Sequence, residues 1–215
     1  MVKIAPSLLS CDFLCIGEAI KFINESADII HIDVMDGSFV PNITIGLPVV
    51  QAISTVAVKT MDTHLMIVNP QNYVERFAAV MPKGSMLSFH LEACPDASAV
   101  LDKIRSLGMK AGLVINPDCP VEKLFPHLEH MDYALIMSVF AGFGGQKFKE
   151  ETFERVKTLK AEIQRRGLSV EIEIDGGVGE SNASLLAGCG ADILVAGTSV
   201  FKAADPAEAV RRLKK

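Results

Sequence analysis

Short apolar runs rich in β-branched residues recur along the chain, and segments with a helical pattern separate them. Most runs are too short for helices and are apolar at consecutive positions, which is typical of strands buried on both faces. Eight segments are predicted to be strands: Ile4–Leu9, Ile29–Met35, Val58–Ile67, Met86–His90, Ala111–Ile115, Tyr133–Val139, Val170–Ile174 and Asp192–Ala196.

The intervening segments predict helices. Apolar residues recur at helical spacing in three of them: at Ile16, Ile20 and Ile23, at Phe153, Val156, Leu159 and Ile163, and at Ala183, Leu186 and Ala187. Residue types that begin or end helices flank several segments: Asp12, Asn69, Asp96 and Ser181 as N-caps, and Gly108, Gly167 and Gly190 as ends. Alternation of strand and helix predicts parallel strands with crossover helices.

Eight such units in 215 residues average about 27 residues each, which suits a compact (β/α)₈ barrel. We therefore predict an α/β fold, a single TIM barrel domain over residues 1–215. An open doubly wound sheet is the rival, and it is disfavoured because no GxGxxG motif follows the first strand.

Composition narrows the function classes. Hydrophobic residues make up 49% of the chain, which excludes disorder for most of it. The net charge of −5, without a basic stripe, argues against a nucleic-acid partner, and no apolar run approaches the ~20 residues of a membrane span. The five cysteines form no CxxC pair, so we expect free thiols and a reducing, cytoplasmic setting, with Cys11 and Cys15 buried.

Candidate chemistry lies where the predicted strands end, because active sites of such barrels occupy that edge. Side chains alternate along a strand, so His31 and Asp33 share one side. If His64 and Asp175 also point into the barrel mouth, two imidazoles and two carboxylates converge. That donor set suits a divalent metal, Zn²⁺, Fe²⁺, Mn²⁺ or Co²⁺. The alternative is a scatter of unrelated polar residues around the mouth.

Neighbouring polar residues are interpreted more conservatively. Asp62 is a candidate support for His64. His90 lacks a paired carboxylate on its own side of the strand, so we expect a core or supporting role for it. Glu173 is interpreted as structural, and Asp36 as a turn residue beside a glycine.

Glycine-rich turns follow the last three predicted strands, at Gly142–Gly145, Gly176-Gly177 and Gly197-Thr198. Such turns expose backbone N–H groups, and barrels often bind phosphate after strands seven and eight. Each glycine pair alone is weak evidence, since turns need glycine anyway. Three at one rim favour a phosphate site.

Six motifs together resemble the ribulose-phosphate 3-epimerase family: Ile4–Ser10, His31–Gly37, Phe39–Asn42, His64–Met66, Gly142–Gln146 and Glu173–Gly177. The resemblance covers nearly the whole chain. It implies a ribulose-phosphate binding type of (β/α)₈ barrel. It also implies interconversion of D-ribulose 5-phosphate and D-xylulose 5-phosphate with one divalent metal, in a homo-oligomer, dimer or hexamer.

The resemblance also implies roles for individual residues. It makes His31, Asp33, His64 and Asp175 the metal ligands, with Asp33 and Asp175 as the catalytic acid/base pair. The implied substrate-binding residues are Ser7, Met35, Met66, Met137, Gly142, Phe143, Gly144, Gly145, Gly176, Gly177, Gly197 and Thr198. Inversion at C3 needs a proton donor and an acceptor on opposite faces of the sugar, and carboxylates from two distant strands meet that need.

Two positions depart from the family pattern. Ser38 stands where the family usually has histidine, and Phe140-Ala141 replaces an acidic residue or asparagine followed by proline. Loss of that proline is expected to loosen a loop over the substrate. Thr198 favours a D-allulose 6-phosphate 3-epimerase, whereas His90–Ala93 favours the ribulose-phosphate branch.

Other functions remain to be weighed. A Schiff-base aldolase needs a lysine at the carboxyl end of a strand, whereas Lys3, Lys59 and Lys110 lie at strand starts and Lys147 lies in a loop, so this function is disfavoured. A decarboxylase of the phosphosugar or nucleotide type would need a Lys-Asp array, which the chain lacks. A non-catalytic phosphosugar-binding protein would not need the complete His/Asp set.

Overall fold

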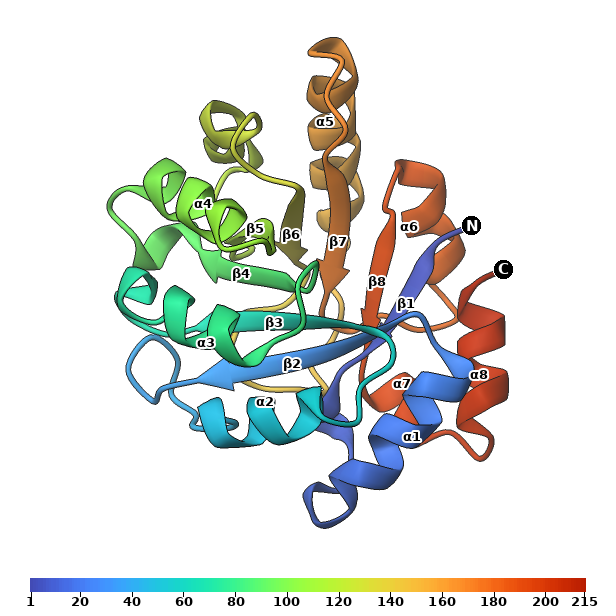
Figure 1. The fold of residues 1–215 in the computed structure, drawn as a ribbon. Helices are drawn as coiled ribbons and strands as arrows, with labels where there is room; N and C mark the ends of the chain where they lie inside the picture. The colour runs from blue at the N-terminus through green and yellow to red at the C-terminus, as the bar shows by residue number, and fades with distance from the viewer.

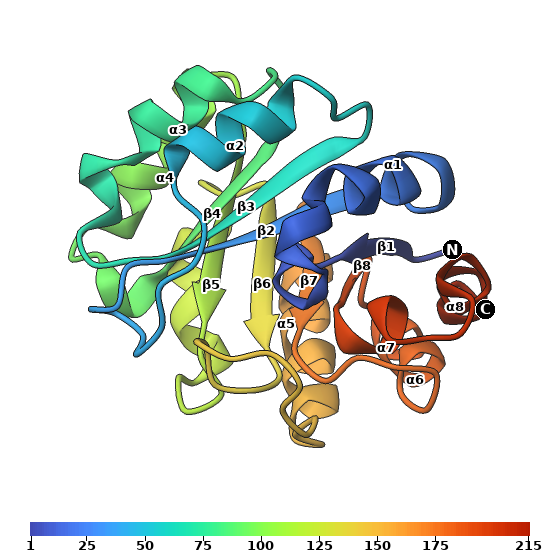
Figure 2. The same cartoon turned by 90° about the horizontal axis from the view of Figure 1, so that it is seen from below.

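The computed structural model describes residues 1–215 and shows eight parallel strands ringed by helices (Figures 1 and 2). The strands are β1 Lys3–Pro6, β2 Ile29–Met35, β3 Thr60–Met66, β4 Met86–His90, β5 Lys110–Ile115, β6 Tyr133–Met137, β7 Glu171–Asp175 and β8 Ile193–Ala196. They pair in the order β1-β8-β7-β6-β5-β4-β3-β2. A parallel bridge between Ser7 and His31 brings β1 beside β2 and nearly closes the barrel. The predicted (β/α)₈ barrel is confirmed.

Helices lie on the outside of the ring: α1 Ile16–Ser26, α2 Leu47–Ser54, α3 Val74–Val80, α4 Ala97–Ser106, α5 Thr152–Arg165, α6 Ala183–Cys189, α7 Thr198–Phe201 and α8 Pro206–Leu213. Asp96 caps α4 by accepting the N–H of Ala99, as predicted. Asn69 and Ser181 are not side-chain caps: Asn69 adopts left-handed backbone, and Asn182 occupies the N-cap position of α6. No helix is long and apolar enough to span a membrane.

Several strand boundaries differ from the prediction. β1 ends at Pro6 rather than at Leu9, since Ser7 Oγ accepts the N–H of Leu9 and starts a 3-10 turn over Leu8–Ser10. β3 begins at Thr60 and β6 ends at Met137. Cys15 is exposed, so its predicted burial was wrong.

The two faces of the strands differ in chemistry. Outward-facing residues such as Ile30, Leu65 and Phe89 pack against the helices in an apolar core of 53 buried residues. Inside the barrel, apolar residues including Ile29, Met86 and Ile193 form a small separate cluster with Tyr133. Buried polar side chains occupy the rest of the interior, towards the carboxyl ends of the strands.

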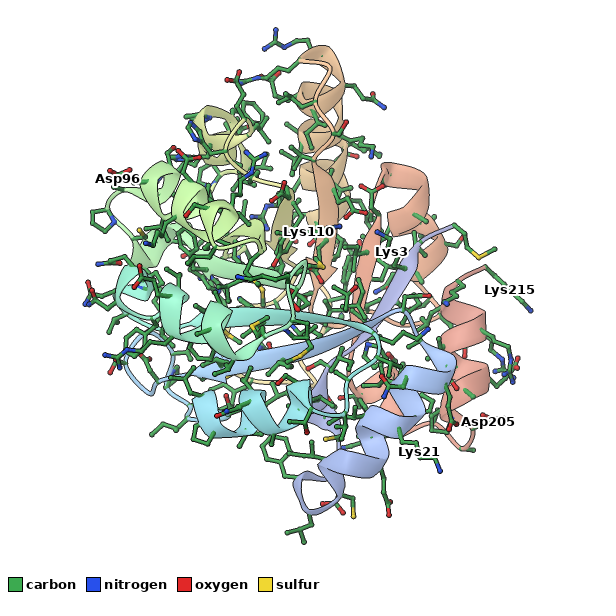
Figure 3. All side chains as sticks on the ribbon, in the orientation of Figure 1. Lys3, Lys21, Asp96, Lys110, Asp205 and Lys215 are labelled. Carbon is green, nitrogen blue, oxygen red and sulfur yellow. The ribbon has the colours of Figure 1, made fainter.

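Lysines mark the opposite end of the barrel (Figure 3). Lys3 begins β1 and Lys110 begins β5, and both pair with Glu171 at the start of β7. None of them is near the carboxyl ends of the strands. Neither residue can therefore serve as the strand-end lysine that a Schiff-base aldolase needs.

Candidate active site

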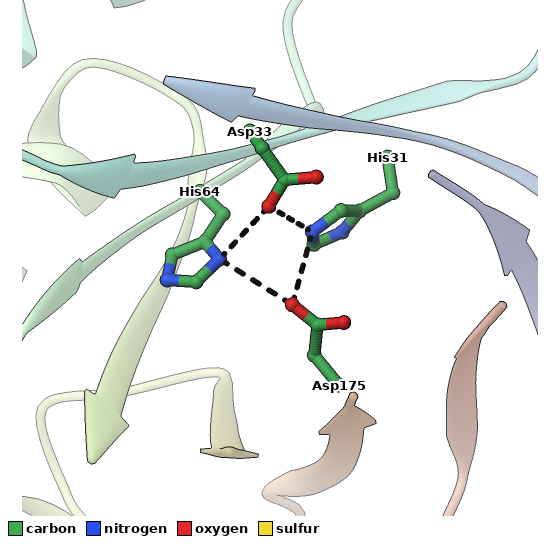
Figure 4. Close-up of side chains that lie close together, drawn as sticks. All are labelled: His31, Asp33, His64 and Asp175. Carbon is green, nitrogen blue, oxygen red and sulfur yellow. Dashed lines mark ion pairs between the residues drawn. The ribbon is translucent and has the colours of Figure 1, made fainter. Parts of the chain in front are cut away.

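Four side chains meet at the carboxyl ends of the strands (Figure 4). Asp33 Oδ1 lies 3.3 Å from His31 Nε2 and 3.4 Å from His64 Nδ1. Asp175 Oδ2 lies 3.8 Å and 3.7 Å from the same two nitrogens. Register explains the meeting, because β2 and β3 pair with Asp33 beside His64, while alternation turns His31 inward as well.

The four residues fit a divalent metal ion. His31 Nε2 and His64 Nδ1 are buried and have no hydrogen-bond partner, a state that costs about 1–3 kcal/mol for each group. The candidate ligand atoms all lie within 4.8 Å of one another. Neighbouring ligands at about 2.1 Å from a common ion lie roughly 3 to 3.4 Å apart, close to the separations observed here.

Burial and neighbouring charges shift the pKa values of the two carboxyl groups in opposite directions. Burial raises the pKa of Asp33, but His31 and His64 outweigh this effect and hold it well below its usual range. Burial and the negative charge of Asp33 raise the pKa of Asp175 to about 6. The side chains of Asp33 and Asp175 are 4% and 16% exposed, and their proton affinities differ. Such a difference is a common feature of acid/base pairs.

A cavity of about 360 Å³ opens beside Asp33 and Asp175. Ser7 lies on its wall and donates a hydrogen bond from Oγ to Asp33 Oδ2 at 2.6 Å. All the residues predicted to bind substrate line this cavity: Ser7, Met35, Met66, Met137, Gly142, Phe143, Gly144, Gly145, Gly176, Gly177, Gly197 and Thr198. The structure brings the predicted set together at one place.

Sequence reasoning missed other residues of the wall: Leu9, Ser10, Val139, Gln146, Val178, Gly179, Val195 and Ser199. Several directly adjoin residues that were predicted, and this adjacency was the available signal. Phe140 also lies on the wall, as expected of a residue in the loop over the substrate. Glycines also have packing reasons here. A Cβ on Gly177 would lie 2.7 Å from the backbone N of Phe148, and one on Gly197 would lie 2.4 Å from Ser10 Oγ.

Asp62 and His90 contact the far sides of the two central imidazoles. Asp62 Oδ2 lies 2.5 Å from His31 Nδ1, so the prediction that Asp62 supports His64 was wrong. His90 Nε2 lies 2.9 Å from His64 Nε2. The expectation that His90 lacks a paired carboxylate was also wrong, because Glu92 Oε2 lies 3.5 Å from His90 Nδ1.

Two predictions concern loops at the mouth of the barrel. Asp36 accepts the N–H groups of Ser38, Phe39 and Val68, which is the turn role predicted for it. The loop after β6 makes a hydrogen bond at the position where the family usually has proline. Ala141 N–H donates to Asn116 Oδ1 at 3.1 Å, a bond that proline cannot make and that opposes the expected loosening. The loosening itself stays a prediction.

Parallel strands, a His/Asp cluster and a glycine-lined cavity at their carboxyl ends define a barrel enzyme with a candidate metal centre. Residues 3–201 match the model of the ribulose-phosphate 3 epimerase family. The chain is 47% identical to the ribulose-phosphate 3-epimerase of Synechocystis sp. over 97% of this chain and 91% of that protein. It is 42% identical to the Bacillus subtilis ribulose-phosphate 3-epimerase over 100% and 99%. The chain therefore belongs to the ribulose-phosphate 3-epimerase family and is an enzyme of the epimerase class.

Solved structures share the fold at low sequence identity. KGPDC from Streptococcus mutans, solved in complex with a sugar phosphate, superposes with a TM-score of 0.77 at 15% identity, over 99% of this chain and 95% of that one. 3-Hexulose-6-phosphate synthase from Salmonella typhimurium gives a TM-score of 0.67 at 17% identity, over 99% and 96%. At these identities the likeness supports the barrel fold alone.

Proposed function

We propose that the chain interconverts D-ribulose 5-phosphate and D-xylulose 5-phosphate, with Asp33 and Asp175 exchanging the proton at C3. One observation carries the proposal: the two carboxylates reach the same cavity from β2 and β7, on either side of the cluster (Figure 4). Inversion requires that the proton leaves one face of the sugar and returns to the other. The family to which the chain belongs supports this assignment.

Ser7 orients the carboxylate of Asp33. Its hydroxyl donates to Asp33 Oδ2, so Oδ1 is the oxygen left facing His31 and His64. A carboxylate oriented in this way enters the reaction without the cost of reorientation. Asp175 at the end of β7 would then supply the proton to the opposite face.

The ligand residues of the proposed metal are His31, Asp33, His64 and Asp175. The divalent ion, when bound, supplies Lewis-acid stabilisation of the negative charge that develops on the substrate oxygens. Two nitrogen and two oxygen donors suit Zn²⁺, Fe²⁺, Mn²⁺ and Co²⁺ alike. The proposal therefore specifies one divalent ion and leaves its element to experiment.

Met35, Met66 and Met137 form the apolar part of the wall, and each is at most 4% exposed. Thioethers offer no proton to a carbanion and repel water from it. We assign these three side chains the task of shielding C3 while it lacks its proton, so that Asp33 and Asp175 control where the proton returns.

Phosphate binding is assigned to the glycine turns on the same cavity, Gly144-Gly145, Gly176-Gly177 and Gly197-Thr198. Backbone N–H groups suit a chain with a net charge of −5, which attracts no anion by its overall field. The solved Streptococcus mutans barrel contains a sugar phosphate, which is consistent with a phosphosugar in such a fold.

Two further predictions concern the organisation of the protein. We predict a homo-oligomer, either a dimer or a hexamer, and a single domain over residues 1–215.

A coupled assay tests the proposal. Purified protein is treated with a chelator, re-supplied separately with Zn²⁺, Fe²⁺, Mn²⁺ or Co²⁺, and offered D-ribulose 5-phosphate or D-allulose 6-phosphate. We expect activity lost on chelation, restored by at least one ion, and greater on the pentulose. Greater activity on the hexulose would favour the allulose-phosphate alternative. Substrate binding without turnover under every condition would indicate a phosphosugar-binding protein.

A further inference from the structure

The two imidazoles of the cluster are each held on the side that faces away from it. His31 presents Nε2 to the cluster and has Asp62 at its Nδ1, 2.5 Å away. His64 presents Nδ1 to the cluster and has His90 at its Nε2, 2.9 Å away. All four side chains are fully buried, so no solvent competes for these nitrogens.

Asp62 determines which nitrogen of His31 carries hydrogen. An imidazole that binds a metal is neutral and carries one hydrogen. With Nε2 facing the cluster, that hydrogen resides on Nδ1 and is donated to Asp62 Oδ2, an oxygen acceptor. The lone pair on Nε2 is then directed at the cluster. Tyr133 fixes Asp62 in turn, because its hydroxyl donates to Asp62 Oδ1 at 3.0 Å.

His90 contacts His64 on the side that faces away from the cluster. Two facing Nε2 atoms form a hydrogen bond only if one donates and the other accepts. Asn116 Oδ1 accepts the N–H of Ala141, so Asn116 Nδ2 donates to His90 Nδ1 at 3.3 Å. The hydrogen of the neutral His90 ring then lies on Nε2 and is donated to His64 Nε2, so this contact does not turn a bare nitrogen of His64 to the cluster.

We infer that Asp62 is a positioning residue that holds His31 with a bare Nε2 toward the metal cluster. The inference rests on the proposed metal site and names a residue outside its ligand set. Carboxylates and other groups behind metal-bound imidazoles typically change metal affinity by 10- to 100-fold. Asp62 contacts the ring of His31 directly, so its replacement is expected to fall within that range.

Glu173 provides a matched control. It is fully buried, and its Oε1 lies 3.8 Å from His31 Nδ1, yet both its oxygens lack a hydrogen-bond partner. Glu173→Gln therefore changes a buried carboxyl group beside the same ring without removing a hydrogen bond to it. His31, Asp62 and Glu173 also form a second possible metal group, so the experiment must count ions.

Chelated wild type, Asp62→Asn and Glu173→Gln are titrated with Co²⁺ and followed by visible absorbance, with the ¹⁵N shifts of His31 measured on the Zn²⁺ form. We expect one ion per chain throughout. Affinity should fall about 10- to 100-fold in Asp62→Asn and hardly in Glu173→Gln. The ¹⁵N spectrum of the wild type should show hydrogen on His31 Nδ1.

Wild-type affinity in Asp62→Asn, with the variant folded by circular dichroism, would overturn the inference. So would two ions in the wild type reduced to one in Asp62→Asn, because Asp62 would then be a ligand itself. No Co²⁺ binding by the wild type would overturn both the inference and the proposed metal site. A wild type that binds Co²⁺ but lacks epimerase activity would contradict only the proposed reaction, and the affinity series would still decide the inference.

Discussion

The outer and inner faces of the barrel strands are equally buried but differ in what the burial achieves. Ile30 and Ile32 on β2 point outward into the apolar core, while His31 and Asp33 on the same strand point inward. The outer face gains stability from every methylene it removes from water. The inner face keeps polar atoms that stay without partners, including His31 Nε2 and His64 Nδ1. Unpaired buried polar atoms destabilise the fold and are typical of functional sites. They therefore distinguish functional residues from packing residues more clearly than solvent exposure does.

The largest effect is expected on the inner face. Asp33→Asn should lower kcat by about 10²- to 10⁴-fold, because it removes one member of the acid/base pair. The unfolding temperature should fall modestly, because the neutral amide loses the attraction of His31 and His64 and this loss is partly offset by relief of the repulsion with Asp175. The coupled assay and calorimetry on one preparation measure both quantities. A variant that keeps a tenth of wild-type turnover would contradict the assignment of catalysis to the inner face and of stability to the outer face.

The outer face should show the reverse behaviour. Leu101 on α4 is fully buried, so Leu101→Ala is expected to lower the free energy of unfolding by about 2–5 kcal/mol. The kcat of the folded enzyme should stay within twofold. Leu185→Ala is the control, because this residue is 60% exposed and should change stability by about 0.5 kcal/mol or less. Urea denaturation and steady-state kinetics provide the two measurements.

Gly112 on β5 lies on the inner face of the barrel, beside the ring of Tyr133. A Cβ at this position would lie 2.2 Å from Tyr133 Cζ, so Gly112→Ala should cost about 1–3 kcal/mol through overpacking. Gly17→Ala in α1 is the control, since nothing lies within 4 Å of its added carbon. Equal stabilities of the two variants in urea would show that the Tyr133 ring moves freely.

The smallest effect is expected at Ser7. Ser7→Ala removes the hydrogen bond to Asp33 Oδ2, and we expect kcat to fall about tenfold with KM nearly unchanged. Ser54→Ala offers a control on the surface, where the hydroxyl bonds only to a carbonyl of its own helix. A Ser7 variant whose loss lies wholly in KM would assign this hydroxyl to substrate binding instead.

Periodicity along single strands was enough to predict much of this architecture. Alternation correctly turned His31, Asp33, His64 and Asp175 to one side, and the glycines placed three turns at one rim. These features are local, since they depend on which side of its own strand a residue occupies. The confirmed barrel then brought the local patterns together at the carboxyl ends.

Relations between strands could not be predicted in the same way. Asp62 supports His31 rather than His64 because β2 and β3 pair with His31 directly opposite Asp62, and a single sequence contains no register. His90 gained a carboxylate because the 3-10 turn at Leu91–Ala93 brings Glu92 back toward it. β1 ended early because the hydroxyl of Ser7 competes with strand geometry.

The central claim is that Asp33 and Asp175 together move the proton at C3. Its most direct test is NMR of D-ribulose 5-phosphate in deuterated water with Asp175→Asn, beside the wild type. The wild type should incorporate deuterium at C3 of both epimers. The variant should show neither deuterium exchange nor turnover above the enzyme-free rate. Substantial turnover by the variant would contradict the assignment of Asp175 to the catalytic pair.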